Sequence, residues 1–210
     1  MRDISAIESG RKGTNDPVTR TSNARPYKMM EEKMKTSELT ELLAQENIKE
    51  EELPALLVNA LTKKKLRVAT AESCTGGLVS GAITSVSGAS GVFDCGVCSY
   101  ANHIKHKIVG VREETLNTYG AVSDRTASEM ARGIRLLAGA DIGISTTGIA
   151  GPLGGSVYKP VGLVYIGVST ANGLRAEKML LGENNADRER IRELAVTAAL
   201  YFALKETEKL

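Results

Sequence analysis

The sequence predicts an α/β fold: a three-layer αβα sandwich around a mixed, mostly parallel β-sheet. From residue 66 onward, β-branched apolar runs alternate with helical patterns, which is typical of strands in an α/β domain. Two further strand patterns near 161–182 follow each other closely and resemble an antiparallel pair. The length of 210 residues fits one domain of roughly 150 residues with an extension.

Residues 1–34 mix Gly, Pro, Asn, Ser and charge without periodicity, so we expect a disordered leader there and one domain over residues 35–210. The expected elements, in order, are helices at 36–47 and 51–64, a buried strand at 66–73, a helix at 74–86 opening on Thr75 and Gly76, a strand at 92–100, helices at 112–120 and 123–139, strands at 141–148, 161–170 and 174–182, and a final helix at 186–206. Ser123 is the expected N-cap of its helix, whose expected buried face is Ala127, Met130, Ala131, Ile134 and Leu137.

Composition excludes several classes of protein. The net charge of +2 and the aromatic content of 4% do not favour a nucleic-acid partner. No apolar run is long enough to span a membrane, and the first 30 residues lack a signal-peptide core. Three cysteines make a poor disulfide framework, so a reducing cytoplasm is the simplest setting. Compact domains of this kind are often symmetric, so we expect a homo-oligomer, with a dimer favoured.

The stretch "TAESCTGGLVSG" (70–81) has the pattern of a strand, a tight turn and a helix start. Backbone N–H groups at a helix N-terminus bind oxyanions or phosphates, and glycine permits close approach. Ser73 is therefore an N-cap, an anion ligand or a nucleophile, and these alternatives stay open on local pattern alone. Cys74 is a second candidate nucleophile, but it needs His103 or His106 as its activating base.

A zinc site is the tempting interpretation of Cys95-x-x-Cys98 followed by His103-x-x-His106. Zinc fingers separate such pairs by about a dozen residues, and here only four intervene. Residues three apart on a strand also point to opposite faces. We therefore reject zinc at this segment.

Lys105 follows Tyr100 by about one helical turn and can return to the edge of the sheet that carries Ser73. A buried lysine whose pKa is lowered acts as a general base, and a neighbouring hydroxyl can relay a proton. Composition alone favours an ordinary surface lysine. Near the last helix, Arg188 and Arg192 lie four apart and suit a phosphate or carboxylate, although a solvated charged face is the commoner meaning of that spacing.

Together these segments resemble the C-terminal domain family of CinA proteins. The stretches that carry the resemblance are "TAESCTGGLVSG", "SVSGASGVFDCGVCSYANHIKHKIVGV", "ETLNTYGAVS", "DIGISTTGIAGPLGGSVYKPVGLVYIGV" and "DRERIR", in order over about residues 52–206. The resemblance implies an amidohydrolase that converts nicotinamide mononucleotide to nicotinic acid mononucleotide and ammonia, in the stand-alone form without an upstream domain. It implies neither a cofactor nor a metal.

The resemblance also implies the roles of individual residues. Ser73 is the nucleophile, Lys105 the general base and Tyr100 its helper, with backbone N–H groups at the head of the helix after Thr75 as oxyanion donors. The expected substrate-binding residues are Thr75, Gly76, Gly77, Gly88, Ala89, Ser90, Asn102, Thr147, Gly148, Ala150, Gly151 and Arg188, with the phosphate on Arg188 and on the turn at 88–90.

Three positions depart from the family pattern: Ala101 replaces a serine, Leu153 an aspartate and Ala186 a glycine. None of them belongs to the proposed Ser73–Lys105 pair. The alternative function is a non-catalytic, competence- or damage-associated nucleotide-binding module. The catalytic hypothesis fails if the nitrogen of Lys105 lies far from the oxygen of Ser73.

Overall fold

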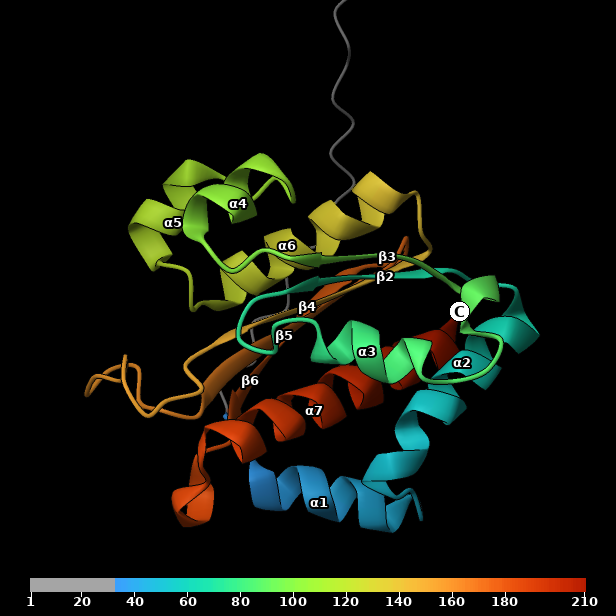
Figure 1. The fold of residues 1–210 in the computed structure, drawn as a ribbon, viewed down its shortest axis with the longest axis horizontal. Helices are drawn as coiled ribbons and strands as arrows, with labels where there is room; N and C mark the ends of the chain where they lie inside the picture. Colours follow the sequence, from blue (N-terminus) through green and yellow to red (C-terminus); the bar gives the residue numbers. More distant parts are fainter. Residues whose placement is uncertain (1–32) are drawn as a thin grey trace, which may run out of the picture.

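A six-stranded mixed sheet organises residues 33–210, the part of the chain that the computed structural model describes (Figure 1). The strand order is β1-β6-β5-β4-β2-β3. The strands are β1 (Met34–Lys35), β2 (Val68–Glu72), β3 (Phe93–Cys98), β4 (Ile142–Gly148), β5 (Leu163–Ser169) and β6 (Leu174–Leu180). β2 pairs in parallel with β3 and β4, β1 pairs in parallel with β6, and β5 is antiparallel to β4 and β6. The predicted mixed, mostly parallel sheet is confirmed.

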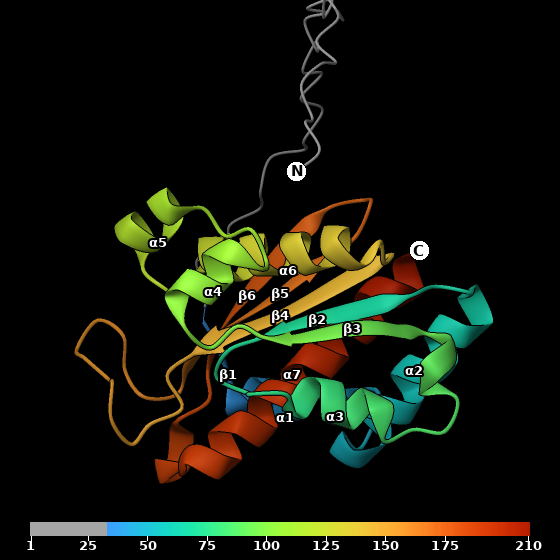
Figure 2. The ribbon, with the colours of Figure 1, turned by 45° about the horizontal axis from the view of Figure 1, so that its top comes forward.

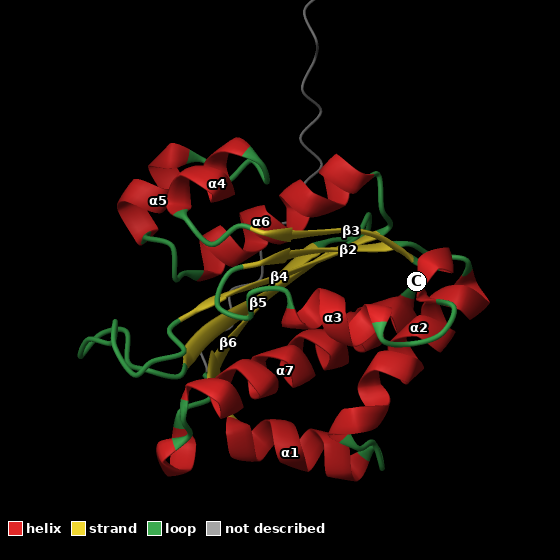
Figure 3. Cartoon of the chain, viewed as in Figure 1, coloured by secondary structure: helices red, strands yellow, loops and turns green. Residues whose placement is uncertain are grey.

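Helices cover both faces of this sheet, as the three-layer prediction requires (Figures 2 and 3). The helices are α1 (Thr36–Gln45), α2 (Leu53–Lys64), α3 (Leu78–Thr84), α4 (Asn102–Lys107), α5 (Glu113–Tyr119), α6 (Asp124–Ala138) and α7 (Arg188–Lys209). α4, α5 and α6 lie on one face, and α2, α3 and α7 lie on the other, with α1 outside α7 (Figure 1). None of the helices in the described part of the chain is both long and apolar enough to cross a membrane.

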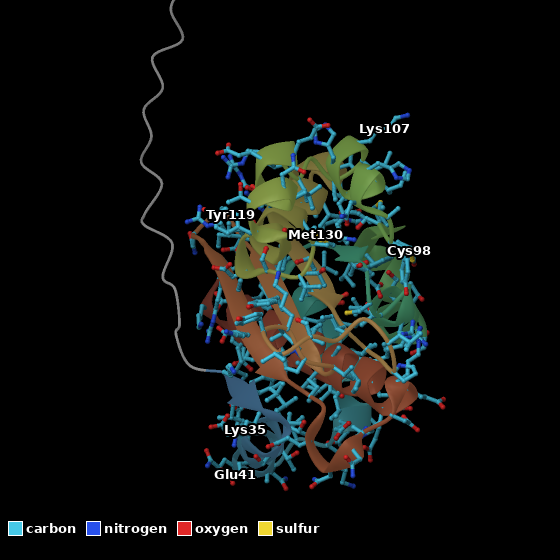
Figure 4. The ribbon with its side chains drawn as sticks, turned by 90° about the vertical axis from the view of Figure 1, so that its left-hand side faces the viewer. Lys35, Glu41, Cys98, Lys107, Tyr119 and Met130 are labelled. Carbon is cyan, nitrogen blue, oxygen red and sulfur yellow. The ribbon has the colours of Figure 1, made fainter. Side chains whose placement is uncertain are left out.

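Two hydrophobic clusters separate the layers. Val68 of β2 belongs to the larger cluster with α2, α3 and α7, whereas Ala69 and Ala71 face the cluster that includes Met130 of α6. Figure 4 shows Met130 within the body of the protein. Because successive strand residues point to opposite faces, the two residues at the end of β2 diverge. This alternation sends Glu72 toward α3 and Ser73 toward α4.

Helix α6 illustrates how local signals set an element. The Ser123 hydroxyl accepts a hydrogen bond from the Thr126 N–H at 3.2 Å, as the predicted N-cap should. Four of the five predicted core residues are buried, but Leu137 is 57% exposed, so that prediction is wrong. In the last turn the buried stripe passes from Ile134 to Ala138, four residues on, and leaves Leu137 outward.

Other boundaries differ from the sequence-based expectation. Residues 1–32 of the expected leader lie outside the described residues, but Met34 already belongs to the sheet through its pairing with Met179. Helix α3 begins at Leu78 and not at Thr75, because the turn before it has left-handed backbone at Gly76 and Gly77. The short helix α4, which carries Lys105, was not among the expected elements.

Candidate active site

The carboxyl ends of β2, β3 and β4 meet at one edge of the sheet, and Ser73 lies there, directly after β2. Its N–H donates to the Thr146 carbonyl at 3.0 Å, which extends the β2–β4 ladder by one residue. A cavity of about 250 Å³ opens beside it. The cavity is lined by Ser73, Cys74, Tyr100, Asn102, Lys105, Ala121, Val122, Thr147, Gly148, Ile149, Ala150, Gly151, Leu153, Gly154 and Arg188.

Lys105 reaches this cavity from α4 and is 1% exposed. Its Nζ lies 3.0 Å from Ser73 Oγ, 2.8 Å from the Ser99 carbonyl oxygen and 3.1 Å from the Tyr100 carbonyl oxygen. Burial disfavours the charged form and lowers the pKa of the Lys105 ammonium from 10.5 to about 8. Among the described residues no carboxylate bonds to Lys105, so nothing there offsets this desolvation by direct pairing.

The three contacts of Nζ suit the lysine amine in either of its protonation states. A neutral lysine has two N–H donors and one lone pair, and two carbonyl oxygens can only accept. As an ammonium, Nζ donates to both carbonyls and to the Ser73 hydroxyl; in the neutral form the carbonyls of Ser99 and Tyr100 keep the two hydrogens, and the lone pair faces the Ser73 hydroxyl. The turn that joins β3 to α4 thus orients the base toward the hydroxyl that it would deprotonate.

Glu72, the residue before Ser73, holds the opposite side of the turn. Its carboxylate is 1% exposed and accepts five hydrogen bonds. The donors are the Thr75 hydroxyl, the N–H groups of Gly77, Val79 and Ser80, and the Ser80 hydroxyl. A carboxylate at a helix N-terminus satisfies the unpaired N–H groups and complements the helix dipole.

This capping corrects the expectation for Thr75, Gly76 and Gly77. None of the three lines the cavity: the Thr75 hydroxyl contacts Glu72 and Thr146, and the glycines supply the left-handed turn at φ +62° and +100°. The first N–H groups of α3 are bonded to Glu72 and so do not serve as oxyanion donors. The sequence does contain a signal for this role, a carboxylate at a strand end shortly before a helix start.

Tyr100 and Arg188 meet across the mouth of the cavity. Arg188 Nη1 donates to the Gly151 carbonyl at 2.7 Å, and Nη2 donates to the Tyr100 hydroxyl at 3.2 Å. The Tyr100 hydroxyl therefore does not contact Lys105, which corrects its expected role as a proton relay; the residue helps the base through its carbonyl instead. Arg192, the neighbour of Arg188 on α7, donates to the carbonyls of Cys74 and Thr75 and so supports the turn.

The turn at Gly88, Ala89 and Ser90 lies at the wrong end of the sheet for its expected contact with the phosphate. It precedes β3, and the Val92 carbonyl accepts from the N–H of Val68, the first residue of β2. Ser73 is five residues further along β2, about 16 Å away along an extended strand. Within one chain, residues 88–90 are therefore not part of the cavity.

The remaining expected residues do come together. Asn102, Thr147, Gly148, Ala150 and Gly151 all line the cavity beside Ser73. The Thr147 hydroxyl donates to the Ala121 carbonyl at 2.7 Å, which ties β4 to the segment before α6. Sequence reasoning missed Ala121, Val122, Ile149, Leu153 and Gly154 as lining residues, because small or apolar residues carry no chemical signature of a site.

The alternative nucleophile and the zinc arrangement both lack the necessary geometry. Burial raises the pKa of the Cys74 thiol to about 11, so its thiolate is scarce at neutral pH. The His106 ring contacts the Val111 carbonyl and not the thiol. Cys95 packs toward α6, whereas Cys98 lies beside Gly77 near α3, so the two sulfurs are on opposite faces of β3. Figure 4 shows Cys98 at the surface.

Comparisons with known proteins agree with this geometry. The family model of the CinA C-terminal domain matches residues 50–207. A competence-damage inducible protein of Thermoanaerobacter pseudethanolicus is 53% identical over 153 residues, which is 73% of this chain and 36% of that protein. A CinA-like protein of Kosmotoga olearia is 51% identical over 153 residues, again 73% of this chain and 36% of the relative. The chain thus spans little more than a third of the length of these relatives.

Solved structures match over most of their own length. The competence/damage inducible protein CihA from Agrobacterium tumefaciens is 43% identical with a TM-score of 0.70, covering 74% of this chain and 95% of that one. A CinA superfamily protein from Klebsiella pneumoniae is 32% identical with a TM-score of 0.72, covering 77% of this chain and 99% of that one. At these identities the chain is related to the solved proteins in sequence as well as in fold.

Proposed function

Because the chain belongs to the CinA C-terminal domain family, we propose that it hydrolyses the carboxamide of nicotinamide mononucleotide, releasing ammonia and nicotinic acid mononucleotide. The observation that carries this proposal is the 3.0 Å contact between Lys105 Nζ and Ser73 Oγ. A serine hydroxyl becomes an effective nucleophile only beside a base. The lowered pKa of Lys105, about 8, supplies a base that is partly neutral near physiological pH.

The first chemical step joins Ser73 to the substrate. As Oγ attacks the amide carbon, its proton passes to the lone pair of Lys105 Nζ, and the carbonyl π electrons move to oxygen. The tetrahedral intermediate then carries one negative charge on that oxygen. Lys105 becomes an ammonium that the carbonyls of Ser99 and Tyr100 accept as partners.

The oxyanion needs donors other than the N–H groups bonded to Glu72. We assign this role to the N–H of Cys74, which follows the nucleophile directly and belongs to a residue that lines the cavity. In serine hydrolases with a strand–turn–helix nucleophile, the N–H of the residue after the nucleophile serves in this way. The capping of α3 by Glu72 would keep this turn in place while charge develops.

The second half of the reaction reverses the proton transfer. Lys105 protonates the amide nitrogen as the carbon–nitrogen bond breaks, and ammonia leaves an acyl ester on Ser73. Water then attacks the ester and gives one proton to Lys105, which passes it to Ser73 Oγ as the bond between Oγ and the acyl carbon breaks. The product acid loses the second proton of the water, and ammonia takes it up in solution. The overall balance is amide plus water to carboxylate plus ammonium.

Arg188 is the proposed contact for the 5′-phosphate. Its guanidinium lies at the cavity and forms no ion pair with a carboxylate among residues 33–210. A guanidinium has five N–H donors, so Arg188 can keep its bonds to Gly151 and Tyr100 and still bind a phosphate oxygen.

The test is ammonia release from nicotinamide mononucleotide by purified wild-type protein and by Ser73→Ala and Lys105→Met. We expect each substitution to lower turnover by at least about a thousandfold, since nucleophile and base act as a unit. Lys105→Met preserves side-chain length in a buried site. Lys107→Met, an exposed lysine on the same helix (Figure 4), is the matched control and should retain full turnover.

Circular dichroism and the melting temperature of each variant distinguish the loss of a catalytic group from unfolding of the protein. Wild-type turnover in folded Ser73→Ala or Lys105→Met would exclude the dyad. Tight binding of the nucleotide by the wild type with no ammonia release would instead favour the non-catalytic nucleotide-binding module.

A further inference from the structure

The charges around the cavity pose a problem for a pyridinium substrate. The ring nitrogen of nicotinamide mononucleotide carries a formal positive charge. Two of the described residues that line the cavity are cationic, Lys105 and Arg188, and none of them is an aspartate or a glutamate. No carboxylate is therefore at hand to pair with the ring, and its charge must be stabilised by another kind of group.

Tyr100 supplies the only aromatic ring among the described lining residues. The face of an aromatic ring attracts cations, and the attraction is stronger when the pair is desolvated. Tyr100 is 62% exposed, so within residues 33–210 much of its ring is left open. An exposed aromatic ring at the mouth of a site is available to a ligand.

Contacts at both ends of Tyr100 fix where its ring lies. Its carbonyl accepts a hydrogen bond from Lys105 Nζ at 3.1 Å, and its hydroxyl accepts from Arg188 Nη2 at 3.2 Å. The ring thus spans the distance between the proposed base, where the carboxamide reacts, and the proposed phosphate contact. The ring is therefore available to a substrate that reaches from Ser73 to Arg188. A ring held in this way loses little conformational freedom on binding.

We propose that the ring of Tyr100 is the binding surface for the cationic pyridinium and makes the site select oxidised over reduced nicotinamide nucleotides. In the reduced, dihydropyridine form the ring has no formal charge, so the cation–π attraction is absent while shape and phosphate are nearly unchanged. This inference rests on the proposed function for the orientation of the substrate, and it assigns Tyr100 a role in specificity in place of proton relay.

The experiment measures binding separately from turnover. Dissociation constants for oxidised and reduced nicotinamide mononucleotide are determined by calorimetry in a Ser73→Ala background, alone and combined with Tyr100→Phe or Tyr100→Leu. We expect the preference for the oxidised form to persist in Tyr100→Phe and to fall about five- to thirtyfold in Tyr100→Leu. Tyr158→Leu is the matched control, because this tyrosine is 93% exposed and does not line the cavity.

The outcomes separate this inference from the proposed function. An unchanged preference for the oxidised nucleotide in Tyr100→Leu would overturn the cation–π subsite even if the wild type releases ammonia. So would an equal loss of affinity for both nucleotides in Tyr100→Phe. A Tyr100-dependent preference without ammonia release from the wild type would sustain the subsite and reject the reaction. Absence of binding by either nucleotide to any variant would reject both.

Discussion

At the scale of single residues, the proposed chemistry depends on a lysine that the fold deprives of water and of carboxylate partners. Burial lowers the pKa of Lys105 to about 8, and the carbonyls of Ser99 and Tyr100 orient its nitrogen. Carbonyl oxygens accept hydrogen bonds from both the neutral and the charged amine. They therefore hold the geometry through the proton transfer.

This arrangement predicts the pH dependence of catalysis. With a pKa of about 8, about a tenth of the Lys105 side chains are neutral at pH 7. The value of kcat/KM for nicotinamide mononucleotide should therefore rise about tenfold per pH unit below pH 8 and level off above it. Ammonia release measured from pH 6 to 10 tests this.

A midpoint near pH 6 would instead report the second ionisation of the substrate phosphate. A profile without any rise above pH 7 would exclude Lys105 as the base.

At the scale of elements, the position of Lys105 depends on how closely α6 approaches the segment after α4. Gly133 of α6 faces Val109 so tightly that an added Cβ would lie 1.7 Å from the Val109 carbonyl oxygen. The same segment returns to α4, since the Val111 N–H donates to the Lys105 carbonyl at 3.1 Å. A side chain at position 133 would therefore push on the helix that carries the base.

Two glycine substitutions separate the effect of this close packing on stability from the effect of helix propensity. Gly133→Ala should destabilise the protein by about 1–3 kcal/mol and reduce turnover, because the methyl group overpacks the contact with Val109. Gly81→Ala in α3 should stabilise it by about 0.5–1 kcal/mol and leave turnover unchanged, because nothing lies within 4 Å of the added Cβ. Urea unfolding and ammonia release measure the two effects. Equal free energies of unfolding for the two variants would contradict the close approach of Gly133 to Val109.

At the scale of the whole molecule, burial of Lys105 destabilises the folded state, and packing elsewhere in the fold compensates for it. The larger hydrophobic cluster lies between the sheet and α1, α2, α3 and α7, on the face away from α4. The site itself sits at the strand ends, where α4 and the loop after β4 close over it. The base is thus carried by a helix on the face that does not hold the larger cluster, which permits a destabilising base at the site.

The pH dependence of the free energy of unfolding should reveal this destabilisation. The pKa of Lys105 is about 8 in the folded protein and 10.5 when unperturbed, so between these values the unfolded chain binds the extra proton. The free energy of unfolding of the wild type should therefore rise with pH over this window relative to Lys105→Met, by up to about 3 kcal/mol. Below pH 8 both folded and unfolded lysines are charged, and the difference should be flat.

Urea unfolding of the wild type, Lys105→Met and Lys107→Met from pH 7 to 10.5 provides the measurement. Lys107 is exposed, so its variant should follow the wild type in slope. Parallel curves for wild type and Lys105→Met would show that the amine of Lys105 is not perturbed in the folded protein.

Most of the elements were predictable because their signals are local. Ser123 caps α6 as its sequence position indicates, and the β-branched run before Ser73 forms β2. The pairing of Ser73 with Lys105 and the nearby Arg188 followed from motif resemblance, and the geometry brings all three to one cavity. In contrast, the glycines at 76, 77 and 88 looked alike in sequence, and none of them lines that cavity.

By itself the sequence determined the order and type of the main elements and the residues capable of chemistry, since periodicity, caps and strand ends involve neighbours along the chain. Only the tertiary structure decided which of those residues share a cavity, that Glu72 occupies the N–H groups of α3, and that the Tyr100 hydroxyl meets Arg188. The physical reason is that burial, hydrogen-bond competition and the pKa of Lys105 depend on groups that are distant in sequence, such as Ser73, 32 positions away, and adjacent in space.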